Sequence, residues 1–204
     1  MIGELTSLDS RNSSFSRVLS PVRPVLVPLF TLDALDPWIA RQEQRDARAS
    51  IETTPSVAAN EPEKLRLLVA GQIKRVSIGI QSTHDATLAS VNRRRQRSLG
   101  DDALENLMSA GFERVSVDLV FGLPEQSVAM FLEDIERVLA HDIDAITIYD
   151  CLYRGEGRAL PGLARSSRPT MSHYATLYDA AYELLISRGY HGRYGGVNFC
   201  RHQG

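Results

Sequence analysis

The sequence predicts an α/β protein whose core is a parallel sheet. Four short runs of β-branched and other apolar residues each carry a polar residue at or near the end. These polar residues are Glu52, Gln81, Asp118 and Asp150. The segments between the runs have the apolar spacing of helices, so successive polar residues lie about thirty to forty positions apart. Parallel strands joined by crossover helices all point the same way, and we therefore expect the four residues to gather where α/β active sites are built, at the carboxyl ends of the strands.

The first part of the chain does not have the pattern of a sheet. Residues 1–30 are weakly patterned, and the stretch PVRPVLVPLF places three prolines among apolar residues. Proline lacks a backbone donor and fixes φ, so we expect an irregular or disordered lead-in there. After it, Leu32, Leu35 and Ile39 suit one face of a helix.

The strands are predicted at residues 49–54, 76–81, 115–121 and 145–149. The third run is nearly continuous in apolar residues, which is typical of a parallel strand that is covered on both faces. Between the first two strands, Asn60 and Glu63 resemble a capping box, and the helix that they open ends at Gly71. A short helix at residues 85–91 follows the second strand.

The remaining helices are predicted from caps and apolar stripes. A helix at residues 101–110 is expected to bury Leu104, Leu107 and Met108. Ser127 can cap the next helix, in which Phe131, Ile135, Val138 and Leu139 share a face. The last helix has the clearest stripe, which begins at Tyr174 and ends before Gly189.

Composition excludes several classes of protein. The net charge of -2 over 204 residues gives no electrostatic case for binding nucleic acid or an anionic membrane. No apolar run is long enough for a transmembrane helix, and the first residues lack the pattern of a secretion signal. Cys151 and Cys200 are too few for a disulfide framework, so we expect a reduced, cytoplasmic setting. No spacing of residues predicts a metal site.

Asp118 is the most informative of the candidate site residues. A carboxylate within VSVDLVFG is costly to bury without a partner, so it caps a loop, pairs with an arginine or binds a ligand. Arg93 in NRRRQR is a candidate partner. Glu52 could bind an amine or a ribose hydroxyl, although a solvated strand end is the simpler interpretation. Gln81 follows a glycine that permits close backbone approach, and its amide offers both donors and acceptors.

Four stretches carry a resemblance to a known family. They are ASIETTPSVAANEPEKLRLL, RVSIGIQSTHDATLASVNRR, AGFERVSVDLVFGLPEQS and GYHGRYGGVNFCR. Together they resemble the oxygen-independent coproporphyrinogen III oxidase-like branch of the radical S-adenosylmethionine (radical SAM) enzymes, from about residue 31 to the end of the chain. The motifs GIQS and DLVFGLP, at this separation, are specific to that branch.

The resemblance implies a fold, a cofactor and a set of binding residues. The family fold is a partial (β/α)6 barrel, of which this chain would supply about four parallel strands with their crossover helices. Glu52 would match the glutamate that contacts the SAM on the iron–sulfur cluster. Gln81, Arg93 and Asp118 would match positions around a second SAM. Leu152 would match a position whose backbone approaches the adenosine.

The family's catalytic beginning is missing from the chain. The CxxxCxxC motif that holds the [4Fe-4S] cluster is absent, and Cys151 and Cys200 lie too late in the chain to replace it. The glycine-rich GGGTP turn is also absent. We therefore expect residues 31–204 to form an incomplete barrel that stops before the family's C-terminal domain. Our hypothesis is a truncated or frame-disrupted product that has no radical chemistry by itself.

The family reaction implied by the resemblance is the oxidative decarboxylation of coproporphyrinogen III, a porphyrinogen-like small molecule. Haem chaperoning, radical methylation and cyclopropanation are alternatives within the family, and a SAM- or haem-binding module or half of a split enzyme are non-catalytic ones. A sheet edge that is exposed at the first strand could self-associate or receive a partner that carries the cluster.

Overall fold

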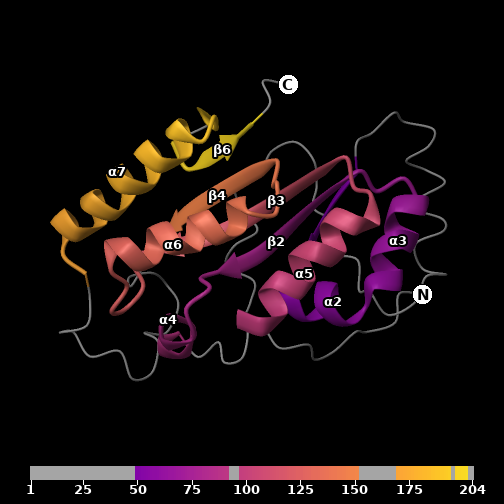
Figure 1. The fold of residues 1–204 in the computed structure, drawn as a ribbon, viewed down its shortest axis with the longest axis horizontal. Helices are drawn as coiled ribbons and strands as arrows, with labels where there is room; N and C mark the ends of the chain where they lie inside the picture. The colour runs from indigo at the N-terminus through magenta and orange to yellow at the C-terminus, as the bar shows by residue number, and fades with distance from the viewer. Residues whose placement is uncertain (1–48, 92–96, 152–168, 194–195, 202–204) are drawn as a thin grey trace, which may run out of the picture.

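The computed structural model describes residues 49–91, 97–151, 169–193 and 196–201, and the structural statements below concern these residues. They form a six-stranded sheet with the order β1-β2-β3-β4-β6-β5 (Figure 1). The strands that pair in parallel are β1 (Ser50–Thr53), β2 (Arg75–Gln81), β3 (Arg114–Phe121) and β4 (Ala145–Asp150). The strands β5 (His191–Arg193) and β6 (Asn198–Cys200) add an antiparallel hairpin to β4.

Helices connect the parallel strands and cover one face of the sheet. They are α2 (Pro55–Asn60), α3 (Pro62–Ala70), α4 (Asp85–Ser90), α5 (Arg97–Ala110), α6 (Val128–Leu139) and α7 (Met171–Ser187). Figure 1 shows α2, α5 and α6 lying along the sheet, with α7 beside the hairpin. None of the helices in these described residues is long and apolar enough to cross a membrane.

The hydrophobic core lies between the helices and the sheet. Side chains alternate along β2 and β3, and every second one is buried. The side chains Ile78, Val117 and Ile146 are fully buried in the same cluster as Phe131 and Leu177. Each large apolar side chain buried in this way stabilises the fold by about 1.5–3 kcal/mol. This packing fixes which face of each strand carries polar residues.

The four predicted parallel strands are confirmed, each within two residues of its expected bounds. They pair in parallel from β1 to β4, with one shift of register between β2 and β3 at Gly79 and Gln81. The hairpin β5–β6 was not predicted, because its strands are only three residues long and carry no readable alternation. Its anchor is Phe199, which is fully buried in the core.

The capping box predicted at Asn60 and Glu63 is wrong. Asn60 is the last residue of α2, and its side-chain amide donates to the Ser56 carbonyl at 2.8 Å. Thr54 caps α2 instead, since its hydroxyl accepts the N–H of Val57 at 3.4 Å. The helix α3 then begins at Pro62 without a side-chain cap. The predicted helix that ends at Gly71 is thus α3, and α2 before it was not predicted.

The later helices agree better with the sequence patterns. The predicted cap at Ser127 is confirmed, because its hydroxyl accepts the N–H of Met130 at 3.2 Å. Met108, which was expected to point inward, is exposed instead. The helix α5 begins earlier than expected, at Arg97. The predicted helix around residues 32–39 and the predicted lead-in lie outside the described residues.

Candidate functional site

The candidate site lies on the face of the sheet opposite the core, which we call the inner face. Its members alternate with the buried core residues along β1 to β4. They are Glu52, Ser77, Gly79, Gln81, Ser116, Asp118, Thr147 and Tyr149. Most of these side chains are polar and partly exposed, in contrast to the isoleucines and valines of the core face. The sheet therefore has one apolar face and one polar face, and the polar one can bind a ligand.

The strand register determines which polar residues are neighbours. Asp118 on β3 lies opposite Gly79 on β2 and Thr147 on β4. Glu52 on β1 lies opposite Ser77, two residues before Gly79 on β2. Neighbouring strands are about 4.8 Å apart and each residue rises about 3.3 Å, so the Cα atoms that carry the two carboxylates are about 12 Å apart. Between these two positions β2 carries only the small residues Ser77 and Gly79.

Asp118 has an unusual protonation equilibrium. The pKa of its carboxyl is raised from 3.8 to about 7, first by burial and second by the negative charge of Glu52. The Thr147 side chain opposes this shift in pKa by hydrogen bonding to the carboxylate. A carboxyl group with a pKa near neutrality can accept or donate a proton at physiological pH, which is frequent at functional sites.

Tyr149 is the aromatic member of the inner face. Its side chain is partly exposed, and burial raises the pKa of the phenol above its usual value of 10.0. The negative charges of Asp118 and Glu52 also raise the pKa of Tyr149. The phenol therefore stays protonated and can donate a hydrogen bond or stack against a planar ligand.

Gln81 ends β2 in a left-handed backbone conformation, with a φ of 70°. The register between β2 and β3 shifts between Gly79 and Gln81, which marks a bulge. The Gln81 amide turns back over Gly79, because a Cβ on Gly79 would lie only 2.5 Å from the Gln81 Nε2 atom. Since Gly79 pairs with Asp118, the amide lies next to the Asp118 strand. Glycine at position 79 is therefore what gives the amide its place on the inner face.

The residues that follow Gln81 are fixed from the helical layer. Asp134 of α6 is fully buried, and its carboxylate accepts hydrogen bonds from Ser82 and Thr83. The bond lengths are 2.9 Å from the Ser82 hydroxyl, 2.7 Å from the Thr83 hydroxyl and 2.5 Å from the Thr83 N–H. Burial raises the pKa of Asp134, and the hydrogen bonds from Thr83 and Ser82 act against that shift in pKa.

The turn after β3 is also closely packed. Gly122 has a φ of 75°, and a Cβ there would lie 2.1 Å from the ring of Tyr174. The Tyr174 hydroxyl donates to the Cys151 carbonyl at 2.6 Å, and the Cys151 N–H donates to the Phe121 carbonyl. This arrangement holds the ends of β3 and β4 together. Gly122 therefore has a structural role in this turn.

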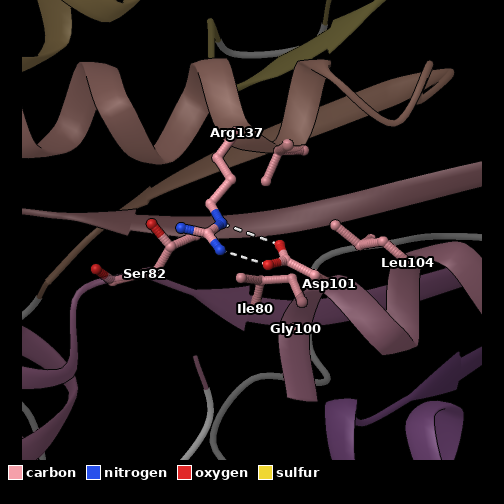
Figure 2. A pocket seen from close by; sticks show the side chains of 8 residues that line it. Ile80, Ser82, Gly100, Asp101, Leu104 and Arg137 are labelled. Carbon is pink, nitrogen blue, oxygen red and sulfur yellow. Dashed lines mark hydrogen bonds and ion pairs between the residues drawn. The ribbon is translucent and has the colours of Figure 1, made fainter. Parts of the chain in front are cut away.

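A small pocket on the opposite side of the sheet does not belong to the inner face. Figure 2 shows its lining residues, in which Arg137 of α6 reaches Asp101 of α5 with two hydrogen bonds. The hydrogen bond to Arg137 is the main cause that lowers the pKa of Asp101. The pocket encloses about 10 Å³, which is room for about one water molecule. We interpret it as a packing feature between α5 and α6.

Three of the five predicted binding residues come together in the structure. Glu52, Gln81 and Asp118 all lie on the inner face. Arg93 and Leu152 lie outside the described residues. Asp150, the fourth polar residue of the sequence pattern, stands at the carboxyl end of β4, but it alternates with Tyr149 and so belongs to the core-side face.

Sequence reasoning missed Thr147 and Asp134. Thr147 has the same alternation as Asp118 on its own strand, but one threonine in an apolar run is not informative. Asp134 did leave a signal, because it is a carboxylate in the apolar stripe between Phe131 and Ile135. A charged residue within the buried stripe of a helix indicates a specific polar partner.

The cysteines do not fit an iron–sulfur cluster. A [4Fe-4S] cluster needs several thiolates around one centre, and the chain has two cysteines. Cys200 pairs with Ala145 at the start of β4, whereas Cys151 follows the end of that strand. Six residues of strand separate these positions by about 20 Å. Among the described residues no group of three metal-binding side chains comes together.

Fold and site together define an α/β protein with a polar, carboxylate-bearing face along a parallel half-barrel sheet. Residues 27–138 match the model of the radical SAM superfamily, and the chain belongs to that superfamily. Its structure is similar to coproporphyrinogen III oxidase (HemN) from Escherichia coli, a radical SAM enzyme, with a TM-score of 0.75 and 22% identity over 87% of this chain and 42% of that one. The fold class that was expected, a partial barrel of this type whose sheet is not closed, is confirmed.

Curated relatives point to the same branch. The chain is 26% identical to the haem chaperone HemW of Lactococcus lactis over 69% of this chain and 37% of that protein. It is 30% identical to the oxygen-independent coproporphyrinogen III oxidase of Thermostichus vulcanus over 76% of this chain and 46% of that protein. The chain thus spans less than half the length of these relatives.

Proposed function

We propose that the inner face binds S-adenosylmethionine through its nucleoside and amino acid groups. The observation that carries this proposal is the Gln81 amide over Gly79, which pairs with Asp118 on the adjacent strand β3, with Glu52 on β1 at the other side of β2. The resemblance assigns Glu52 to the SAM of the cluster site and Gln81, Arg93 and Asp118 to a second SAM. Leu152 is assigned to the adenosine through its backbone.

The chemistry of these side chains suits such a ligand. S-adenosylmethionine carries a sulfonium and an ammonium group, and carboxylates such as Glu52 and Asp118 attract both. Carboxylates also accept hydrogen bonds from ribose hydroxyls, and the Gln81 amide offers a donor and an acceptor. A cationic ligand favours the ionised form of Asp118, whose pKa lies at about 7. Binding should therefore release a proton and strengthen as the pH rises through neutrality.

Catalysis requires more than this face provides. In the superfamily the [4Fe-4S] cluster supplies the electron that cleaves SAM, and the two cysteines of this chain do not fit it. We propose that the 204-residue chain is an incomplete radical SAM barrel, with residues 31–204 as its barrel part, and that it has no radical activity by itself.

The activity that we propose for the family is inferred from the curated relatives. Oxidative decarboxylation of a coproporphyrinogen is the reaction we propose for the enzyme type to which this barrel corresponds, supported by the similarity to the Thermostichus oxidase. Haem chaperoning is the second candidate, supported by the similarity to the Lactococcus protein. Cys151 and Cys200 lie too far apart to form a disulfide with each other, which favours a reducing compartment, and we propose the cytoplasm.

The binding proposal is tested by titrating S-adenosylmethionine into the full chain in a calorimeter. Asp118→Ala should weaken binding by about tenfold, because one charge-assisted contact is lost. Asp150→Ala is the matched control, since this carboxylate ends the adjacent strand on the other face. Equal losses in the two variants, or no binding by the unmodified chain, would overturn the proposal.

The catalytic part needs a second experiment. Anaerobic incubation with iron and sulfide should give no absorbance at about 400 nm, the region of thiolate-bound clusters, and no 5′-deoxyadenosine. A stoichiometric cluster in the chain alone would refute this expectation. Activity that appears only after adding a CxxxCxxC-bearing protein would instead identify half of a split enzyme. Haem binding without any binding of S-adenosylmethionine would favour the chaperone.

A further inference from the structure

Asp134 is the most deeply buried charged residue among the described parts of the chain. Its side chain lies in the apolar stripe of α6, next to Ile135, and has no exposed surface. Burying a carboxylate costs free energy unless hydrogen bonds replace its water. All three of the replacing donors come from two consecutive residues, Ser82 and Thr83. The carboxylate therefore holds one short piece of chain, at the end of β2.

That piece of chain follows directly after Gln81. A left-handed φ is strained for a residue with a side chain, so the conformation of Gln81 persists only if its surroundings impose it. The N–H of Ser82 also donates to the Ile80 carbonyl, which closes a tight turn around Gln81. Asp134 fixes the far side of this turn by binding the N–H of Thr83 at 2.5 Å.

His84 adds a second attachment to the same helix. Its Nε2 atom lies 3.1 Å from the Met130 carbonyl and 3.8 Å from an Asp134 oxygen. Its backbone N–H donates to the Ser82 hydroxyl at 3.2 Å. Residues 82–84 are thus joined to α6 along their whole length, and Asp134 is the central contact.

We propose that Asp134 is a positioning residue for the inner face. It acts from the opposite side of the sheet, since its bonds to Ser82 and Thr83 keep Gln81 left-handed and hold the amide over Gly79. Because Gly79 pairs with Asp118, the same bonds set the spacing between that amide and the Asp118 carboxylate. The importance of this spacing for ligand binding rests on the proposed function, whereas the control of the Gln81 conformation does not.

The first test needs no ligand. Nuclear magnetic resonance of the full chain gives the coupling between the amide and α protons of Gln81, which depends on φ. In Asp134→Ala the coupling should rise toward the value of extended backbone. Asp134→Asn keeps one oxygen that accepts from Thr83 and should retain the unmodified value. An unchanged coupling in folded Asp134→Ala would overturn the proposal.

Two further variants guard against misfolding and general destabilisation. Thr83→Val removes one hydrogen bond to Asp134 with almost no change of shape, so it should give a smaller change in the same direction if Asp134→Ala does not fold. Asp144→Ala is the matched control, because this carboxylate accepts the N–H of Val115 at 2.8 Å at the other end of the sheet. It should leave the Gln81 coupling unchanged, and an equal change there would also contradict the proposal.

The second test uses S-adenosylmethionine as the probe. Asp134→Ala should weaken its binding by about fivefold to tenfold, the effect of losing one well-placed hydrogen bond. In the Gln81→Ala background the same substitution should have no further effect, because Asp134 acts through Gln81. Additive losses would show a purely structural role. If the unmodified chain does not bind the probe, the proposed function fails, and the coupling experiment still decides the role of Asp134.

Discussion

Replacing the Asp118 carboxyl by an amide should change how the stability of the protein depends on pH. In the folded chain the pKa of Asp118 is about 7, compared with 3.8 for an unperturbed carboxyl. The folded state therefore binds a proton that the unfolded state has lost, at every pH between these two values. The free energy of unfolding must then fall as the pH rises through this window. The Asp118→Asn side chain does not titrate, so the free energy of unfolding of this variant should not fall in the same way.

The size of the effect follows from the two pKa values. One unit of difference in pKa corresponds to about 1.4 kcal/mol. From about pH 5 to about pH 7 the unfolded carboxyl is ionised and the folded one is not, so the unmodified protein should lose about 2 to 3 kcal/mol relative to Asp118→Asn. Partial exposure of the carboxyl makes this an upper value. Below the unfolded pKa the two proteins should depend on pH in the same way.

The assay is urea unfolding followed by circular dichroism at about pH 5, pH 6, pH 7 and pH 8. Glu52→Gln is the internal check, because it removes the neighbouring charge that contributes to the raised pKa of Asp118. The stability of that variant should fall less steeply with pH than that of the unmodified chain. Parallel curves for the unmodified chain and Asp118→Asn would refute the electrostatic argument for the inner face.

Two further predictions concern the turns that hold the site in place. Gly122→Ala should destabilise the protein by more than about 2 kcal/mol, because it adds left-handed strain and its Cβ meets the Tyr174 ring at 2.1 Å. Gly189→Ala, where φ is 83° and no atom is within 4 Å, should cost only about 1 kcal/mol, and equal losses in urea unfolding would contradict the steric part. Ser127→Ala should cost about 1 kcal/mol through its lost helix cap. Ser109→Ala, at an exposed position inside α5, should cost nothing, and a similar loss there would refute the capping explanation.

The parallel part of the fold could be predicted because its strands are uniform in character. Runs such as that of β3, whose buried face is entirely apolar, indicate parallel strands packed under helices whatever surrounds them. The hairpin could not be predicted, because pairing to β4 stabilises it and its own three-residue strands have no pattern. The capping box at Asn60 was predicted wrongly because the local pattern is ambiguous. A polar residue before an apolar stripe can end one helix as well as begin the next.

The site was predictable only in part. Glu52 and Gln81 stand at or near strand ends and Asp118 lies within β3, and the parallel direction of the strands brings such residues to one region of the sheet. Asp150 stands in a similar place, but one step along the strand turns its side chain to the other face. Asp134 supports the turn after Gln81 through its contact with Thr83, 51 positions away in the chain. The sequence pattern around neither residue indicates this contact. Strand periodicity thus predicts candidates, and tertiary packing decides which of them meet.

The missing side chain at Gly79 has an evolutionary consequence. Any larger residue there would displace the Gln81 amide, while the rest of the sheet could remain in place. Positions 79 and 81 should therefore have changed together during descent. Relatives that keep glycine at position 79 should keep glutamine at position 81. Relatives with a larger residue at position 79 should have a shorter or different residue at position 81. Such paired substitutions would record where this branch altered its ligand.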